Sequence, residues 1–170
     1  MMFVHRFGEG MMMSAPALIG FQIGYGNVVQ AKYNLSIFLL HGLILITFQT
    51  LLMNHYKESF MYILTDIPSV RVSAKEILFK LTLNVYPELY KNQMKGVIRA
   101  LGLQYKAVWI HFFGNWIVMP CQDVYCVVFE MGLIGIWCSK LTMECTICLL
   151  QTVLIDCSDW RKIAKLSKSR

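Results

Sequence analysis

The chain has 170 residues, of which 56% are hydrophobic and only 15% are charged. A soluble domain usually carries about 25% charged residues, so the composition favours a protein with several membrane spans over a single soluble domain. The formal net charge of +6 does not indicate nucleic-acid binding, because no platform of stacking aromatic and basic residues accompanies the basic C-terminal segment.

Two apolar segments occupy the N-terminal third of the chain. Residues 1–10 carry both acidic and basic side chains and predict a loop. Residues 11–26 are uncharged but fall short of the roughly 20 residues that a membrane helix needs. They predict a short span that is either kinked at Pro16 or extended backwards through Phe7. Residues 35–54 form an apolar run without a formal charge and predict a complete membrane helix.

Residues 69–98 predict a long helix that carries a polar stripe. Its polar residues recur at steps of three and four, which places them on one helix face: Lys80, Asn84, Glu88, Lys91 or Asn92, Lys95 and Arg99. In a membrane protein such a stripe lines a wet cavity, whereas in a soluble protein it is a solvated surface. Pro87 lies inside this segment and predicts a kink, because proline removes one backbone donor.

The C-terminal half predicts two further spans and a basic end. Residues 107–129 and 136–155 are apolar, with a loop over 99–106 and a glycine-rich turn over 130–136. The fold class is therefore an all-α, polytopic membrane bundle with about five spans. We expect residues 1–156 to form the membrane domain and residues 157–170 to form a basic cytoplasmic tail.

The distribution of basic residues predicts the orientation of these spans. Lys32, Arg99 and Lys106 fall on the same side as the tail, whereas Lys57 and Arg71 fall on the other. Because basic loops stay in the cytoplasm, the C-terminus is expected inside and the N-terminus outside, in a plasma or vacuolar-type membrane.

No pattern in the sequence predicts an enzyme, a cofactor or a metal site. Cys145 and Cys148 have the spacing of half a zinc or redox motif, but no second pair or histidine cluster accompanies them. The cysteines in the apolar runs are predicted to be small buried side chains, and His41 and His111 to be hydrogen-bonded core residues. No Ser-His-Asp order or phosphate-binding loop occurs.

Five short motifs in order resemble the C-terminal lobe of the multidrug and toxic compound extrusion (MATE) family of transporters. They lie at residues 26–32, 65–70, 96–104, 132–137 and 158–164, so the resemblance covers nearly the whole chain. The matching signature residues are Gly26, Asn27, Gly96, Arg99, Gly102, Gln104, Gly132, Gly135 and Trp137. The resemblance implies helices eight to twelve of a twelve-helix, two-lobed antiporter, with the N-lobe and helix seven supplied elsewhere or missing.

The resemblance also implies a coupling residue. Eukaryotic members carry an acidic residue eleven positions before the signature arginine, and Glu88 stands eleven positions before Arg99. A carboxylate inside a bilayer is costly to keep charged, so Glu88 is expected to load and release a proton or cation. The structural alternative is a Glu88 paired with Lys91 or Lys95 on its own helix.

Other polar residues are weaker candidates. Asn84, Tyr86, Tyr90 and Asn92 are candidates for contacting an organic cation, the tyrosines through their ring faces. The alternative, which we favour, is that they are interface aromatics and polar residues that pack between helices. Asp123 is either an intramembrane functional group or a residue near the outer surface, which we favour. Lys140 and Glu144 are four residues apart and predict a structural ion pair.

The resulting hypothesis is a secondary antiporter, or part of one, embedded in the lipid bilayer. It exports small organic cations or other xenobiotics in exchange for protons or Na⁺ by alternating access. The alternative is a truncated membrane fragment or helper subunit that does not transport by itself.

Overall fold

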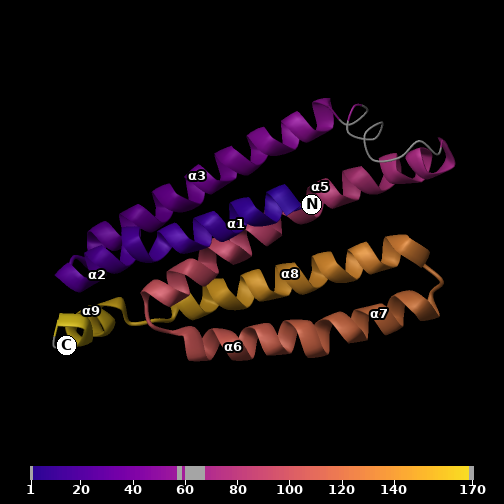
Figure 1. The fold of residues 1–170 in the computed structure, drawn as a ribbon. Helices are drawn as coiled ribbons and strands as arrows, with labels where there is room; N and C mark the ends of the chain where they lie inside the picture. The colour runs from indigo at the N-terminus through magenta and orange to yellow at the C-terminus, as the bar shows by residue number, and fades with distance from the viewer. Residues whose placement is uncertain (1, 57–58, 60–67, 169–170) are drawn as a thin grey trace.

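The computed structural model describes residues 2–56, 59 and 68–168, with side chains described at 8–56, 59, 82–132 and 134–167. Within these residues all regular structure is helical, and long rods lie side by side (Figure 1). Residues 65–67 of the second motif and Lys57 of the predicted outer loop lie outside the described residues. Arg71 lies in a described helix, but its side chain is not among those described.

The chain begins with a helix that reaches through Pro16. Helix α1 (Met2–Ala15) continues through a wider π-helical segment, η1 (Pro16–Gly20), into α2 (Phe21–Tyr25). The prediction of a loop over residues 1–10 was wrong, because residues 2–10 are helical, and the helix extends backwards through Phe7 as expected. That this helix spans the membrane stays a prediction. Pro16 stands at the first position of η1, where the wider turn accommodates its missing donor without ending the helix.

A two-residue turn separates this rod from α3 (Val28–His55). Gly26 adopts a left-handed φ of 81° and its N–H bonds to the carbonyl of Ile23 at 2.9 Å, which ends α2. The side chain of Asn27 then accepts from the N–H of Gln30 at 3.2 Å and caps α3. Because α3 begins directly at this cap, Lys32 lies in the helix and not in a loop before it.

Helix α5 (Pro68–Ala100) is the central rod and packs against α1, α3 and α8. It contains the predicted segment 69–98, and Pro87 lies inside it. Gly102, with a φ of 70°, allows the N–H of Leu103 to bond to the carbonyl of Ile98 at 3.0 Å. The helix therefore ends in one tight turn, and the predicted loop over 99–106 is shorter than expected.

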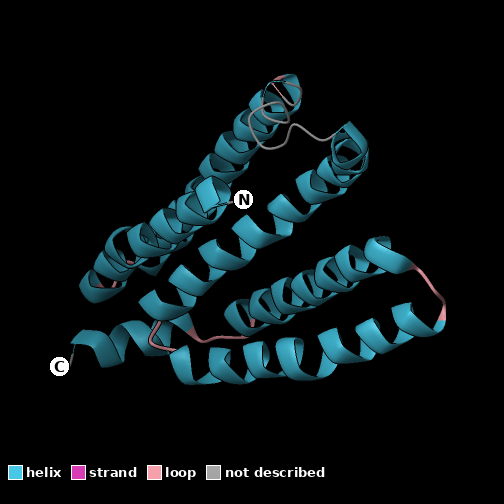
Figure 2. Cartoon of the chain, turned by 45° about the vertical axis from the view of Figure 1, so that its right-hand side comes forward, coloured by secondary structure: helices cyan, strands magenta, loops and turns pink. Residues whose placement is uncertain are grey.

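The C-terminal half is a helical hairpin followed by a short helix. Its first arm runs through α6 (Gln104–Phe113), η2 (Gly114–Val118) and α7 (Met119–Val128), and its second is α8 (Gly132–Asp156). The two arms lie alongside each other in both ribbon views (Figure 2). The predicted turn over 130–136 was too long, because α7 ends at Val128 and α8 already begins at Gly132. Glu130 and Gly132 make this turn with left-handed φ values of 51° and 56°. Gly135 belongs to α8, where an added Cβ would lie 2.7 Å from Cys126 of α7.

The last described segment is not a free tail. Helix α9 (Trp160–Lys168) is preceded by Asp159, whose carboxylate accepts from the N–H of Lys162 at 3.1 Å and caps the helix. Trp160 is 5% exposed and donates to the carbonyl of Ile155, and together with Ala164 it joins the core around α1, η1 and α2. The division of the chain at residue 156 stays a prediction.

Large apolar side chains cover the outer surface of the bundle. Helix α3 and the stretch Ile134–Asp156 of α8 are long and apolar enough to cross a membrane, and only 17% of the most apolar window of α3 is buried. A helix of that composition in a soluble core would be mostly buried, so its surface suits lipid. The other predicted spans are interrupted by π segments or, in α5, carry many charges, and they stay predictions.

Several predicted core residues lie on this surface instead. His41, Cys121, Cys138 and Cys145 are exposed, whereas Cys126 and Cys148 are buried as expected. These histidine and cysteine residues occur in uniformly apolar runs, and such runs do not indicate which helix face contacts protein and which contacts lipid.

Candidate functional site

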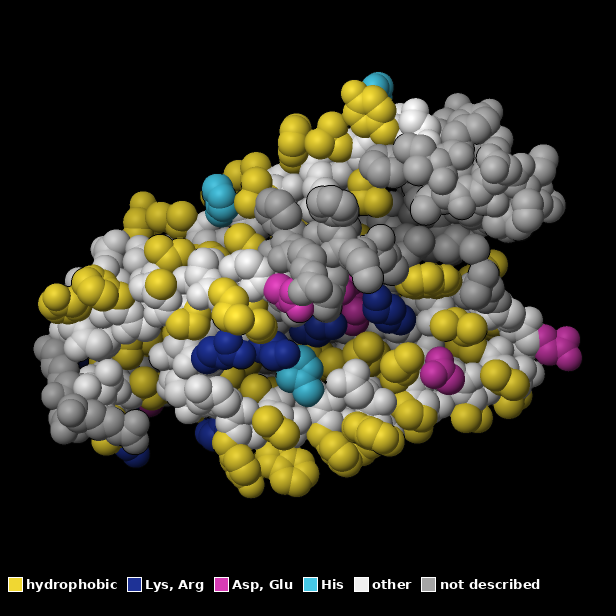
Figure 3. All heavy atoms as spheres, in the orientation of Figure 1, with side chains coloured by type: hydrophobic (Ala, Val, Ile, Leu, Met, Phe, Trp, Pro, Cys, Tyr) yellow, Lys and Arg dark blue, Asp and Glu magenta, His cyan; other side chains and the backbone are white. Residues whose placement is uncertain are grey.

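The polar face of α5 meets charged residues of α8. Lys91 Nζ lies 3.3 Å from Glu144 Oε1, and Lys140 Nζ lies 3.7 Å from both Glu144 Oε1 and Glu88 Oε2. We call these four residues the ion-pair network. Figure 3 shows charged side chains gathered in a band between the upper helices and the lower hairpin, with hydrophobic side chains above and below. The network therefore joins α5 and α8 through charged side chains.

Burial differs within the ion-pair network. The side chain of Glu144 is 1% exposed, compared with 15% for Glu88, 17% for Lys91 and 28% for Lys140. Removing such charges from water is costly unless each has a partner. The two lysines and two glutamates offset one another in charge, which permits them to lie this deep.

The pairing crosses between helices. The sequence spacing predicted Lys91 or Lys95 of the same helix as the partner of Glu88. In the structure, Lys140 of α8 pairs with Glu88, and Lys91 pairs with Glu144 of α8. Helical periodicity describes one helix at a time, so it identified the pair Lys140–Glu144 but not the two contacts between helices.

Further polar groups extend this face of α5. His111 of α6 is half-buried, lies 3.1 Å from Gln151 Nε2 of α8, and faces Lys95 and Lys91. Lys140 Nζ also lies 5.7 Å from the ring centre of Trp137, within range for a cation–π contact. Gln151 is fully buried and was not singled out from the sequence, because one glutamine in an apolar run carries no motif.

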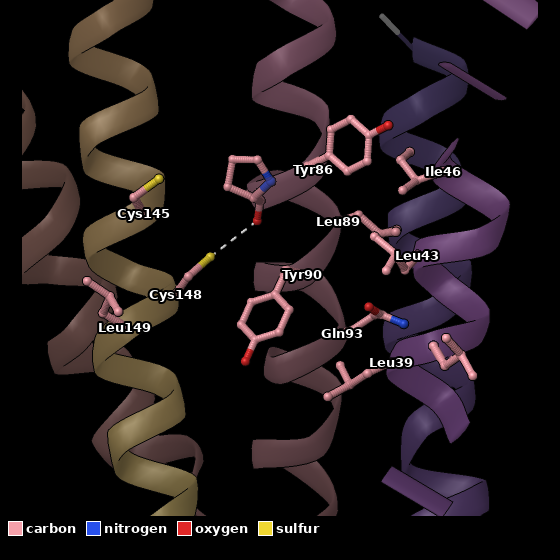
Figure 4. A pocket seen from close by; sticks show the side chains of 12 residues that line it. Leu39, Leu43, Ile46, Tyr86, Leu89, Tyr90, Gln93, Cys145, Cys148 and Leu149 are labelled. Atoms are coloured by element: carbon pink, nitrogen blue, oxygen red, sulfur yellow. Dashed lines mark hydrogen bonds between the residues drawn. The ribbon is translucent and has the colours of Figure 1, made fainter. Parts of the chain in front are cut away.

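The opposite face of α5 borders an apolar groove. The groove has a volume of about 580 Å³ and lies between α3, α5 and α8 (Figure 4). Its lining includes Tyr86, Tyr90 and Gln93 of α5, Leu43 of α3 and Cys145 of α8. A groove of this size with a few polar groups suits a small organic molecule.

Hydrogen bonds fix the polar groups beside the groove. Tyr90 Oη lies 2.8 Å from Thr152 Oγ1 of α8, and Gln93 Nε2 donates to the carbonyl of Phe38 in α3 at 2.8 Å. The thiol of Cys148 donates to the carbonyl of Pro87 at 3.3 Å. These bonds hold α3 and α8 on either side of α5.

The residues predicted to contact substrate lie in two different environments. Tyr86 and Tyr90 line the groove, whereas Asn84 is 2% and Asn92 9% exposed. Asn92 faces α1, where its amide nitrogen would lie 2.6 Å from a Cβ added to Gly8. The polar residues of α5 therefore meet different neighbours, because Asn92 faces α1 whereas Lys91 pairs with Glu144 of α8. Their contact with a substrate stays a prediction.

Asp123 lies apart from the ion-pair network. It sits half-buried on α7, and among the described residues its Oδ1 has no hydrogen-bond partner. None of the ion pairs of the network includes it.

The signature residues mainly build the architecture. Gly26, Gly102 and Gly132 make turns, Asn27 caps α3 and Gln104 begins α6. A Cβ added to Gly96 would lie 2.6 Å from the carbonyl oxygen of Met12, so this glycine sets the crossing of α1 and α5. Arg99 is exposed, with its Nη1 3.7 Å from the sulfur of Met13.

The described residues contain no group of three or more His, Cys, Asp or Glu side chains that could hold a metal ion. The arrangement instead offers buried acids with lysine partners on one face of α5 and an apolar groove on the other.

A scan against protein-family models finds no match, and neither does a search of curated protein sequences. Among solved structures, the crystal structure of the eukaryotic MATE transporter AtDTX14 superimposes with a TM-score of 0.87 over 98% of this chain, at 18% sequence identity. The chain has the fold of part of a MATE transporter. It spans 38% of the AtDTX14 chain, and at this identity the likeness concerns the fold and not the activity.

Proposed function

We propose that this chain is one membrane-embedded part of a MATE-type secondary antiporter. The antiporter exports organic cations or other small xenobiotics in exchange for protons or Na⁺. The observation that carries the proposal is the match of 98% of the chain to part of a eukaryotic MATE transporter with a TM-score of 0.87.

The surface and the interior support the same proposal. Exposed apolar residues on α3 suit lipid, whereas Glu88 and Glu144 lie between helices with lysine partners. Ionisable residues held inside membrane bundles are expensive and usually belong to ion or substrate pathways.

The two faces of α5 suggest a division of roles. Glu88 remains the candidate for coupling to protons or cations, and its pairing with Lys140 gives it a partner to exchange for an incoming ion. Tyr86 and Tyr90 border the apolar groove, where aromatic faces suit a lipophilic cation. Asn84, Asn92 and Asp123 are not among the residues that line the groove, so they support a substrate pathway less than the two tyrosines do.

The proposed topology has about five spans, with α9 and the basic C-terminal residues in the cytoplasm. Trp160, Ala164 and the cation–π contact of Lys32 with Trp160 at 5.6 Å hold α9 against the bundle. Arg161, Lys162 and Lys165 then face the anionic headgroups of the inner leaflet.

A second candidate is a membrane subunit that does not transport by itself. The specific observation in its favour is that the chain spans 38% of AtDTX14, whereas alternating access in this fold requires two lobes. Under this alternative the ion-pair network stabilises the bundle and the partner lobe completes the pathway.

Flux into proteoliposomes separates the two candidates. The full chain is reconstituted, a pH or Na⁺ gradient is imposed, and entry of a fluorescent lipophilic cation is recorded. We expect gradient-dependent flux that Glu88→Gln reduces to the level of protein-free liposomes. Flux equal to that of protein-free liposomes, from a chain shown to be inserted in the bilayer, would exclude transport by this chain alone and favour the second candidate.

A further inference from the structure

Glu144 differs from every other acid in the described part of the bundle. Its side chain is 1% exposed, and its Oε1 lies near both Lys91 and Lys140. Its Oε2 is buried and has no hydrogen-bond partner among the described residues. An ionised carboxylate accepts hydrogen bonds at both oxygens, so a buried oxygen without a donor is a costly state.

We propose that Glu144 of α8 takes up and releases a proton, which it holds on Oε2. The proposal rests on the proposed function, since it names the residue through which a proton would act on the helix bundle. It extends that function, because sequence spacing assigned Glu144 only to a structural pair with Lys140.

The charge balance of this step follows from the ion-pair network. A proton from the aqueous phase forms an O–H bond at Oε2, and Glu144 changes from −1 to neutral. Lys91 and Lys140 then lose the carboxylate charge that they share, while Lys140 keeps Glu88 at 3.7 Å. The net charge of the four residues rises from zero to +1, which loosens the electrostatic contact between α5 and α8. Release of the proton restores the contact.

Several charged or titratable side chains lie near Glu144. The charges that act on it are Lys91 and Glu88 of α5 and Lys140 of its own helix. From α6, His111 faces Lys91 and Lys95. The thiols of Cys148 and Cys145 lie on the same helix as Glu144, and Cys148 is within range of its charge.

The helix that pairs with α8 in the hairpin, α7, carries one charged residue, Asp123. Asp123 is not among the charges that act on Glu144. An experiment that assigns a pH-dependent signal to Glu144 must therefore distinguish it chiefly from signals that arise at Glu88 and His111.

Glu88 is a weaker candidate for the buried proton on geometric grounds. It is 15% exposed and has a lysine beside Oε2, so water and Lys140 both stabilise its charge. Glu144 has neither access to water nor a donor on its second oxygen. The inference consequently places the proton on the less exposed Glu144 of α8, whereas the sequence resemblance placed it on Glu88 of α5.

Trp137 provides a direct readout. Lys140 lies 5.7 Å from its ring centre, so a change in the ion pairs of Lys140 alters the charge beside the indole. The experiment titrates the tryptophan fluorescence of the full chain in lipid vesicles from acid to neutral pH. Wild type, Glu144→Gln, Glu144→Asp, Glu88→Gln and Trp137→Phe are compared, and circular dichroism confirms helicity.

We expect a reversible fluorescence change in wild type that is lost in Glu144→Gln and in Trp137→Phe. It should survive in Glu144→Asp and in Glu88→Gln with a shifted midpoint. If Glu144→Gln does not fold, the charge-balanced double variant Lys91→Gln/Glu144→Gln replaces it, because Lys140 and Glu88 still form a neutral pair. An unchanged titration in either variant, or no titration in wild type, would overturn the proposal.

A flux measurement separates this proposal from the proposed function. In proteoliposomes, Glu144→Gln is expected to abolish the dependence of cation flux on the pH gradient. Flux that keeps its full pH dependence in Glu144→Gln would overturn the role of Glu144 and leave antiport intact. Absence of flux in wild type would count against antiport by the chain, while the fluorescence titration would still decide the role of Glu144.

Discussion

Helix α5 makes two contacts of opposite character. Toward α1 it is close-packed through small residues, since a Cβ on Gly96 would lie 2.6 Å from the carbonyl oxygen of Met12 and 2.8 Å from Ala15 Cβ. Toward α8 it makes ion pairs and hydrogen bonds, including Lys91–Glu144 and Tyr90–Thr152. In membranes small residues permit close backbone approach, whereas polar residues add directional bonds.

The difference between the contacts indicates which part of the bundle can respond to ions. A close-packed interface has one arrangement, and altering it requires backbone movement. An interface of charges changes its energy when one proton is added. We therefore expect α1 and α5 to move together and the contact of α5 with α8 to be the one that senses pH.

The largest effect is expected from filling the α1–α5 contact. Gly96→Val places side-chain atoms against the backbone of α1 and should lower the free energy of unfolding by about 3 kcal/mol. The measurement is titration with a denaturing detergent, followed by circular dichroism. Gly24→Val is the matched control, because a Cβ at Gly24 meets nothing within 4 Å. Equal stability of the two variants would show that α1 and α5 are not tightly packed.

A smaller effect is expected at the charged contact. Lys91→Met removes a partner of the buried Glu144 but leaves Lys140, so the free energy of unfolding should fall by about 2 kcal/mol. The double variant Lys91→Met/Glu144→Met should recover most of this loss, because a buried pair replaced by apolar groups is close to neutral. Additive losses in the same detergent titration would contradict a direct interaction between the two residues.

The smallest effect is expected at the hydrogen bond beside the groove. Tyr90→Phe removes the hydroxyl that lies 2.8 Å from Thr152 Oγ1 and should cost about 0.6 kcal/mol, a typical value for such bonds in membrane proteins. A double-mutant cycle with Thr152→Val measures the coupling. A coupling energy of zero would mean that the bond does not contribute to the α5–α8 contact.

The sequence predicted the helices whose patterns were unambiguous. The polar stripe over 69–98 gave the extent of α5 (Pro68–Ala100) closely, with Gly102 in the turn that follows it. The apolar run over 35–54 gave the C-terminal end of α3, but the helix begins earlier, at Val28, directly after the turn at Gly26. The first helix was missed over residues 2–10, where mixed charges resembled a loop although these residues are helical and the helix continues through Pro16.

The candidate site was less predictable. Glu88 and the pair Lys140–Glu144 follow from spacing within one helix, but Lys91–Glu144 and Lys140–Glu88 depend on how α5 and α8 face each other. Periodicity also cannot say that α1 covers Asn92 while α8 covers Lys91. Contacts between helices decide which part of a polar stripe is buried, and a single sequence holds no direct signal for them.

The central claim is that lipid covers the apolar outside of this bundle while water reaches the charged face of α5. Lys95 and Ile44 are both exposed on the protein, and their cysteine variants test this claim most directly. In vesicles, with the exposed native cysteines replaced by serine, a water-soluble maleimide should label Lys95→Cys but leave Ile44→Cys unreacted until the protein is denatured. Equal labelling of both positions in intact vesicles would contradict the account.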